Sequence, residues 1–245
     1  PALPASWRLL ASLYAMVGRQ RDAAVAQRHA AKLAELAPEI VTARSMLSDG
    51  NLRDAETVIR GYLKRTPEDI EAMRVLAQVA HQNEFSRDSA LLLEEVLAKA
   101  PDYRAARHDY VLALIAMHRH REAREQLDIL MAAEPDSVGH RITLAGILVG
   151  EGSTEEAIAL YRELLKQRPD DPELHVSLAH ALKTRGRRAE AERSYGEATR
   201  LRPSFGDAWW SLANLKTYRF PDAEIAAMRE QLAARHTSHR ERYHL

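Results

Sequence analysis

Residues 170–203 read DDPELHVSLAHALKTRGRRAEAERSYGEATRLRP, and this stretch decides the fold. It divides into two short segments around the turn Arg185-Gly186-Arg187, and Pro203 closes it. Small or apolar side chains recur at helical spacing on both sides of the turn: Leu178, Ala179, Leu182, Ala191, Tyr195 and Ala198. Glycine marks a turn, and proline disfavours helix in the residue before it. The stretch therefore predicts two short helices joined as a hairpin.

The same unit recurs along the chain with a fixed period. Its closing prolines are separated by four successive intervals of 34 residues: Pro67, Pro101, Pro135, Pro169 and Pro203. This period, with this internal pattern, resembles the tetratricopeptide repeat (TPR). The resemblance implies an all-α, right-handed TPR α-solenoid, a superhelix of antiparallel helix pairs in which each pair packs only on its neighbours.

The period divides the chain into about six repeats and an atypical end. The repeats are expected at 4–38, 39–69, 70–103, 104–137, 138–171 and 172–205. An aberrant seventh or capping helix pair follows at 206–234, with its last helix beginning at Asp222 as N-cap. Residues 235–245 are polar and are read as a tail or as the start of a further C-terminal domain.

The first two repeats depart from the regular length. Helices are expected at 4–17 and 21–36, the second about one turn longer than its equivalents, because 20 residues separate Gly18 from Pro38 against 17 in later repeats. Repeat two spans only 29 residues from Pro38 to Pro67, so its first helix, 41–48, is shortened. We expect a change of twist or a local gap there.

Positions eight and twenty of repeats three to six carry small side chains, which let the two helices of a repeat approach closely. They are Ala77, Val111, Ala145 and Ala179 at position eight, and Ser89, Ala123, Ala157 and Ala191 at position twenty. A larger side chain there would overpack the contact. We interpret these periodic positions as core.

Composition excludes several classes of function. The chain of 245 residues has 35 basic and 35 acidic residues, whereas nucleic-acid binding usually needs a basic domain. It has no cysteine, which excludes disulfides and thiolate metal sites. No signal peptide is visible, and no apolar run is long enough to span a membrane. We expect a cytoplasmic protein that binds neither nucleic acid nor membrane.

The TPR resemblance implies that first helices line a concave groove for a protein or peptide ligand. The groove residues predicted from the repeat positions are Arg74, Gln78, His108, Leu112, Ile115, Ile142, Val149, Val176, His180, Lys183, Trp210, Asn214 and Tyr218. The middle of this face is apolar, and an exposed apolar patch often marks an interaction site. The alternative is that neighbouring side chains cover the patch.

Known ligand and catalytic patterns are absent from the sequence. Chaperone-binding TPRs hold a C-terminal carboxylate with Lys and Asn at groove positions five and nine, where repeat three has Arg74 and Gln78. The TPR arm of O-linked N-acetylglucosamine transferases has a ladder of asparagines along its groove. This chain has three asparagines in total, too few for such a ladder. No phosphate-binding or dinucleotide motif occurs. The histidine pairs at 118/120 and 236/239 are weak candidates, so we expect no catalytic, cofactor or metal site.

Residues 205–232, FGDAWWSLANLKTYRFPDAEIAAMREQL, resemble the junction in bacterial proteins that join N-terminal TPRs to a C-terminal sulfotransferase domain. The resemblance implies a catalytic domain after Leu245 that transfers a sulfuryl group from phosphoadenosine phosphosulfate (PAPS). Trp209 is expected in the core, and Trp210, Tyr218 and Phe220 are candidates for docking that domain. The alternative is a capping repeat that buries its own aromatic side chains.

The sequence thus predicts a non-catalytic interaction scaffold, the partner- or substrate-recruiting arm of a sulfotransferase. Two alternatives stay open. One is a free-standing TPR adaptor. The other is a homo-oligomerisation module that uses the apolar first helix near Leu9 and Leu13.

Overall fold

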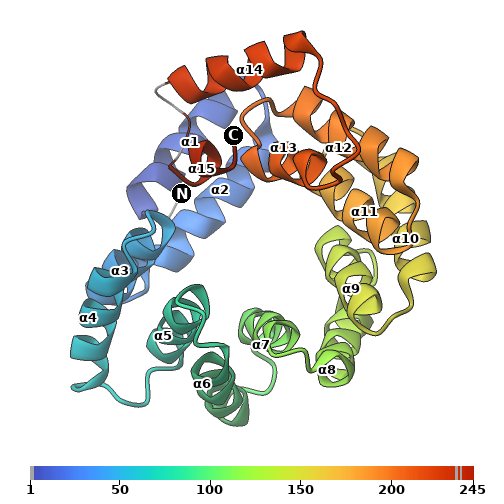
Figure 1. Ribbon diagram of the computed structural model, residues 1–245. Helices are drawn as coiled ribbons and strands as arrows, with labels where there is room; N and C mark the ends of the chain where they lie inside the picture. The colour runs from blue at the N-terminus through green and yellow to red at the C-terminus, as the bar shows by residue number, and fades with distance from the viewer. Residues whose placement is uncertain (1–2, 235–236, 238) are drawn as a thin grey trace. The chain divides into compact units, whose positions relative to one another are not determined.

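The computed structural model describes residues 3–234, 237 and 239–245. Over these ranges the chain forms fifteen α-helices and no strand, and successive helices pack as antiparallel pairs (Figure 1). The predicted all-α solenoid fold is confirmed. The chain divides into two compact units, Pro1–Gln126 and Leu127–Leu245, and the division falls within helix α8 (His120–Ala133).

Unit 1 contains three helical hairpins, then α7 and the start of α8. Its complete helices are α1 (Pro4–Met16), α2 (Gln20–Ala34), α3 (Pro38–Ser48), α4 (Leu52–Leu63), α5 (Ile70–Gln82), α6 (Ser86–Lys99) and α7 (Arg104–Ala116). Successive hairpins pack on each other, since α4 contacts α5 and α6 contacts α7. Helix α5 also contacts α3 and α7, so these three first helices form one continuous surface. We call this surface the first-helix face of unit 1.

Unit 2 begins with the end of α8 and continues the repeat pattern. Its further helices are α9 (Val138–Gly150), α10 (Thr154–Gln167), α11 (Pro172–Thr184), α12 (Arg188–Leu201), α13 (Gly206–Ala213), α14 (Asp222–Ala233) and α15 (His239–His244). One cluster of buried side chains runs from α9 to α13 and includes Ala145, Tyr161, Tyr195 and Trp209. Helix α14 begins as expected, although Pro221 and not Asp222 is its N-cap residue. Asp222 is instead the first residue of the helix, where its charge complements the helix dipole.

The turn between the two helices of a repeat has a recurrent backbone conformation. Residues with positive φ stand at 34-residue intervals: Gly50, Glu84, His118, Gly152 and Gly186. The following amide bonds back to the first helix, as in the 2.8 Å bond from Phe85 N to Ala80 O, which is the Schellman pattern of helix ends. Glycine adopts positive φ without a Cβ penalty, so Glu84 (φ 67°) and His118 (φ 58°) are strained positions.

The repeat positions predicted as core are buried. Exposure is 0% for Ala77, Val111, Ala145, Ala179, Ala123, Ala157 and Ala191, and 1% for Ser89. That prediction is confirmed. The second helices also end just before the repeat prolines, since α6 ends at Lys99 before Pro101 and α12 ends at Leu201 before Pro203.

Repeats one and two differ from the expected lengths because of Pro38. Helix α2 has 15 residues against 14 in α10 and α12, so the predicted extra turn is a single residue. Pro38 does not close repeat one; it occupies the first turn of α3, a position that tolerates proline because its amide has no helical partner. Helix α3 therefore starts three residues before the predicted 41 but, at 11 residues, is still shorter than the 13-residue α5.

Candidate functional site

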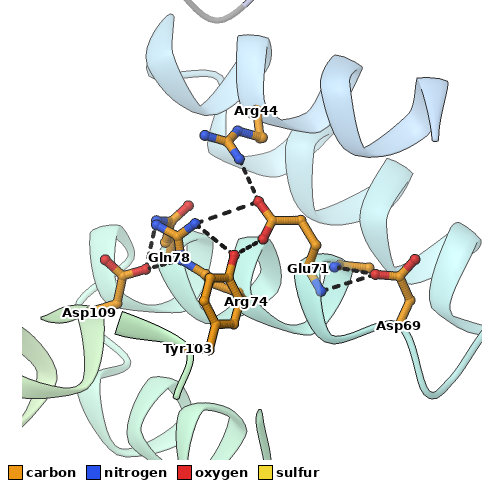
Figure 2. A network of polar contacts seen from close by, with 8 residues as sticks. Arg44, Asp69, Glu71, Arg74, Gln78, Tyr103 and Asp109 are labelled. Carbon is orange, nitrogen blue, oxygen red and sulfur yellow. Dashed lines mark hydrogen bonds and ion pairs between the residues drawn. The ribbon is translucent and has the colours of Figure 1, made fainter. Parts of the chain in front are cut away.

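A network of polar side chains joins α3, α5 and α7 on the first-helix face of unit 1 (Figure 2). It is built on α5, where Asp69 Oδ1 accepts 3.0 Å hydrogen bonds from the backbone amides of Glu71 and Ala72. Such a cap satisfies amides that the first turn of a helix leaves without partners. Tyr62 OH donates to Asp69 Oδ2 at 2.9 Å, which ties this cap to α4.

Glu71 is the central acceptor of the network. Arg44 of α3 donates to its Oε1 through one guanidinium nitrogen at 2.5 Å. Tyr103, the residue before α7, donates its hydroxyl to Glu71 Oε2. Arg74 in turn donates to the Tyr103 hydroxyl at 3.2 Å. Burial, together with the bond to Glu71, raises the pKa of Tyr103 to about 12, so the phenol stays a neutral donor near neutral pH.

Arg74 extends the network to α7. Its Nε donates to Asp109 Oδ2 at 2.7 Å, and Gln78 donates to the same oxygen at 2.8 Å. The Arg74 and Asp109 side chains are only 13% and 15% exposed. Burial acts to lower the pKa of Arg74, but the acidic neighbours, Asp109 first, outweigh it and raise the pKa. The Arg74 charge is therefore kept, since a buried charge is tolerated when it is paired.

Two cavities lie beside this network. The α2–α5 cavity, of about 330 Å³, is lined among others by Trp7, His29, Leu36, Arg44 and Arg74. The Trp7 and His29 rings stack there with centroids 4.5 Å apart. The change of twist or local gap expected at the short second repeat stays a prediction. The α5–α7 cavity, of about 250 Å³, is lined among others by Leu47, Gln78, His81, Ser89, Asp109 and Leu112.

Comparison with protein families decides the identity of the repeats. Residues 40–104 and 109–172 match a model described as tetratricopeptide repeat, and residues 148–215 match a second model of the same description. The chain belongs to the tetratricopeptide repeat family. Stacked repeats of this kind form extended binding surfaces, and TPRs generally serve protein–protein interaction.

Solved TPR structures share this fold at low sequence identity. TTC0263, a thermophilic TPR protein of Thermus thermophilus, matches with a TM-score of 0.64 and 20% identity over 74% of this chain and 98% of that chain. A TPR protein of Parabacteroides merdae has a TM-score of 0.64 at 14% identity, over 99% of this chain and 97% of that chain. MamA of Desulfovibrio magneticus has a TM-score of 0.55 at 15% identity, covering 69% of this chain and 97% of that chain. No curated protein sequence matches the chain.

Three of the predicted TPR groove residues in unit 1 come together. Arg74 and Gln78 belong to the polar network, and Gln78 and Leu112 line the α5–α7 cavity. His108 and Ile115 are half-buried on α7. Ligand binding by these residues stays a prediction.

The repeat pattern did not indicate Asp109 or Tyr103, because neither occupies a standard TPR groove position. A signal was nevertheless present in the sequence. Arg74 and Asp109 are 35 residues apart, one period plus one, and this spacing places opposite charges on adjacent first helices.

The apolar groove residues predicted in unit 2 pack largely on their own repeats. Ile142 and Val149 are partly buried against the core of the unit. Val176 is 8% exposed and belongs to that core, so it has little surface to offer a ligand. The other predicted groove residues of α11 and the following repeat lie at or near the surface: His180, Lys183 and Asn214. Their role in binding stays a prediction.

The aromatic side chains of the seventh TPR unit divide into buried and exposed ones. Trp209 is 4% exposed and donates its indole N–H to Pro203 O at 2.8 Å, so its predicted core position is confirmed. Tyr218 and Phe220 are partly buried against the same core, with their rings 5.1 Å apart. These two side chains therefore contribute to the packing of unit 2. Trp210 is 54% exposed and remains a candidate for docking.

The chain after α14 is not simply a polar tail where the structure describes it. Helix α15 packs on α13, and Gly206 N donates to Glu241 Oε2 at 2.7 Å. His244 Nδ1 lies 2.5 Å from Asp207 Oδ1, and the His244 ring lies 5.9 Å from that of Trp210. Part of the α13 surface predicted to dock a further domain is thus in contact with the chain's own α15.

The described ranges contain no group of three His, Asp or Glu side chains placed to hold a metal ion. The His118 and His120 rings lie 5.8 Å apart. His236, half of the other histidine pair, lies outside the described residues. Among the helices that are described, none has the length and apolar character needed to cross a membrane.

Proposed function

We propose that this chain is a non-catalytic TPR scaffold that binds a peptide segment of a partner protein across the first-helix face of unit 1. The polar network supports this proposal, because Arg44, Glu71, Arg74 and Asp109 hold one another in fixed positions between two cavities. A surface whose side chains are already ordered loses little conformational entropy when a ligand binds.

The spacing of the cavities favours a peptide over a small metabolite. The two cavities follow one another along α5, since Glu71 and Arg74 line the α2–α5 cavity and Gln78 and His81 line the α5–α7 cavity. Two separate hollows on one surface suit successive anchor side chains of an extended or helical segment. The intervening charges are already paired, so recognition would depend on side-chain shape and hydrogen bonding rather than on net charge.

Two glutamine substitutions test this proposal. Gln82, at the exposed end of α5, lines the α5–α7 cavity, whereas Gln27 is exposed on α2 outside both cavities. Peptides are first selected on the wild-type chain from a random linear library displayed on phage. By calorimetry, Gln82→Arg should weaken the selected peptides about tenfold or more by blocking one anchor pocket, and Gln27→Arg should leave them unchanged. Equal affinity for both variants would contradict the proposal.

A narrower proposal is that the scaffold recruits a partner or substrate to a PAPS-dependent sulfotransferase domain. Its support is the resemblance of residues 205–232 to the TPR–sulfotransferase junction. The test is the coding sequence after Leu245. An in-frame strand, an Arg/Ser/Thr-rich loop and a helix would support this role, and a stop codon within a few residues would leave a free-standing adaptor. A cytoplasmic location likewise stays a prediction.

Homo-oligomerisation is the second candidate. It is favoured by one observation, the apolar row on α1, where Leu9 and Leu13 are 64% and 49% exposed. Sedimentation velocity over a range of protein concentrations distinguishes a self-associating chain from a monomeric scaffold. A monomer at all concentrations would exclude this candidate, and a Leu9→Glu variant that restores a monomer would support it.

A further inference from the structure

The α5–α7 cavity contains a buried hydroxyl that the repeat architecture does not need. Ser89 of α6 stands at position twenty, where the next three repeats have Ala123, Ala157 and Ala191. Alanine at this position is enough for close helix packing, since all three are fully buried. Ser89 is 1% exposed, and its Oγ has no hydrogen-bond partner.

A second polar group in the same cavity is also without a partner. His81 Nδ1 is buried and forms no hydrogen bond, and both His81 and Ser89 line the cavity. Buried polar groups in proteins are nearly always hydrogen-bonded, because leaving one unpaired is costly. At about 250 Å³ the cavity is far larger than the roughly 10–15 Å³ that one water needs. The two groups are therefore suited to pair with a side chain that enters the cavity.

The charges around the cavity indicate a neutral ligand group. The Asp109 carboxylate is paired with Arg74, and both of its hydrogen bonds, from Arg74 and Gln78, fall on Oδ2. Oδ1 is left as an acceptor. A carboxylate entering beside Asp109 would be repelled, and an ammonium group would meet the Arg74 guanidinium 2.7 Å from the same carboxylate. Either charge would lose its hydration without a free counter-charge.

We propose that the α5–α7 cavity takes the carboxamide side chain of an asparagine or glutamine in the bound peptide, an inference that rests on the proposed function. A carboxamide is neutral and combines an NH₂ donor with a carbonyl acceptor. Its NH₂ group donates to Asp109 Oδ1, and its carbonyl accepts from the Ser89 hydroxyl. His81 offers a further ring nitrogen. The methylene stem packs between Leu47 and Leu112, the apolar side chains of the lining.

Parallel selection of peptides tests the assignment. A random linear peptide library displayed on phage is selected on the full wild-type chain and on Ser89→Ala. We expect Asn or Gln to be enriched at one fixed position in the wild-type pool and not in the Ser89→Ala pool. Peptides from the wild-type pool should bind Ser89→Ala about tenfold more weakly, the loss of one side-chain hydrogen bond in a buried site. Ser12→Ala, the same chemical change at an exposed position of α1, should keep the wild-type preference.

The outcomes separate this inference from the proposed function. Binding peptides without a fixed Asn or Gln, or the same enrichment on Ser89→Ala, would overturn the carboxamide subsite and leave the peptide scaffold intact. A selection that yields no binding peptide would overturn both. The melting temperature of Ser89→Ala provides a second test, since removal of an unpaired hydroxyl should leave it equal or higher. A lower melting temperature would assign Ser89 to the fold and overturn the subsite.

Discussion

Arg74 Nε lies 2.7 Å from Asp109 Oδ2, and this ion pair ties α5 to α7 across adjacent repeats. The two residues are 35 positions apart in sequence, and their side chains are largely buried. The spacing between first helices of unit 1 therefore depends on a polar contact as well as on alanine packing between the helices of each repeat. The same contact orders the surface to which we assign peptide binding.

Removal of Arg74 should destabilise the chain by leaving the Asp109 charge buried with only Gln78 as a partner. We expect Arg74→Met to lower the free energy of unfolding by about 2–3 kcal/mol, less than for a fully buried ion pair because both side chains keep some exposure. Urea unfolding followed by circular dichroism measures the change. A loss below about 0.5 kcal/mol would mean that the pair is effectively solvated.

A double-mutant cycle distinguishes the ion pair from general damage to packing. Asp109→Leu alone should also be destabilising, whereas the double variant Arg74→Met/Asp109→Leu should be less destabilised than the sum of the single changes by about 1 kcal/mol or more. Strict additivity of the two effects would contradict a direct interaction.

Tyr103 should make stability fall at alkaline pH. Burial and Glu71 raise its folded pKa from 10.0 to about 12, so the unfolded chain releases this proton at lower pH than the folded chain. The stabilisation is complete below pH 10 and is lost as the pH rises toward 12. Tyr103→Phe should reduce this alkaline slope and should cost about 1–2 kcal/mol at neutral pH through the lost bond to Glu71. Urea unfolding across this pH range measures both effects. An alkaline slope of stability that is unchanged in Tyr103→Phe would contradict the assignment.

Glu84 occupies a backbone position that favours glycine. Its φ is 67°, and the equivalent turns contain Gly50, Gly152 and Gly186. Glu84→Gly should therefore raise the free energy of unfolding by about 0.5–1 kcal/mol, because the strain relieved exceeds the added freedom of the unfolded chain. The matched control is Asn83→Gly one residue earlier, at φ −83°, where glycine relieves no strain and should not stabilise. A gain of equal size at both positions would contradict the argument.

Gly206 allows α15 to lie against α13. A Cβ at this position would stand 2.3 Å from the Glu241 carbonyl oxygen and 2.9 Å from His244 Cβ, and the first of these is a backbone atom that cannot rotate away. Gly206→Ala should displace α15 and increase hydrogen exchange in residues 241–245. Gly146→Ala is the control, because a Cβ there meets nothing within 4 Å, and alanine in this helix should stabilise by roughly 0.5–1 kcal/mol. Unchanged exchange in the Gly206 variant would contradict the docked position of α15.

The regular part of the fold was predictable because a TPR is a local structure. The 34-residue period, the small side chains at positions eight and twenty and the turns at Gly152 and Gly186 all act within one hairpin. Pro38 was misread because proline can end one helix or begin the next, and only the structure shows that it begins α3. The positive φ of Glu84 and His118 was not predicted, because neither residue type indicates a left-handed backbone conformation.

The candidate site was predictable only in part because its contacts cross between repeats. Arg74 and Gln78 followed from the groove positions of a TPR, but their partner Asp109 depends on how α5 and α7 are placed against each other. Val176 was assigned to the groove by position, yet the packing of unit 2 buries it. Ser89 was recognised as small, but only the packed structure shows that its hydroxyl has no hydrogen-bond partner.

The central claim is that peptide ligands bind the first-helix face of unit 1, and hydrogen–deuterium exchange with a selected peptide bound tests it most directly. We expect new protection at the exchanging ends of α3, α5 and α7, with little change in α4 and α6 behind them. Protection confined to α4 and α6, or confined to residues 127–245, would contradict the account.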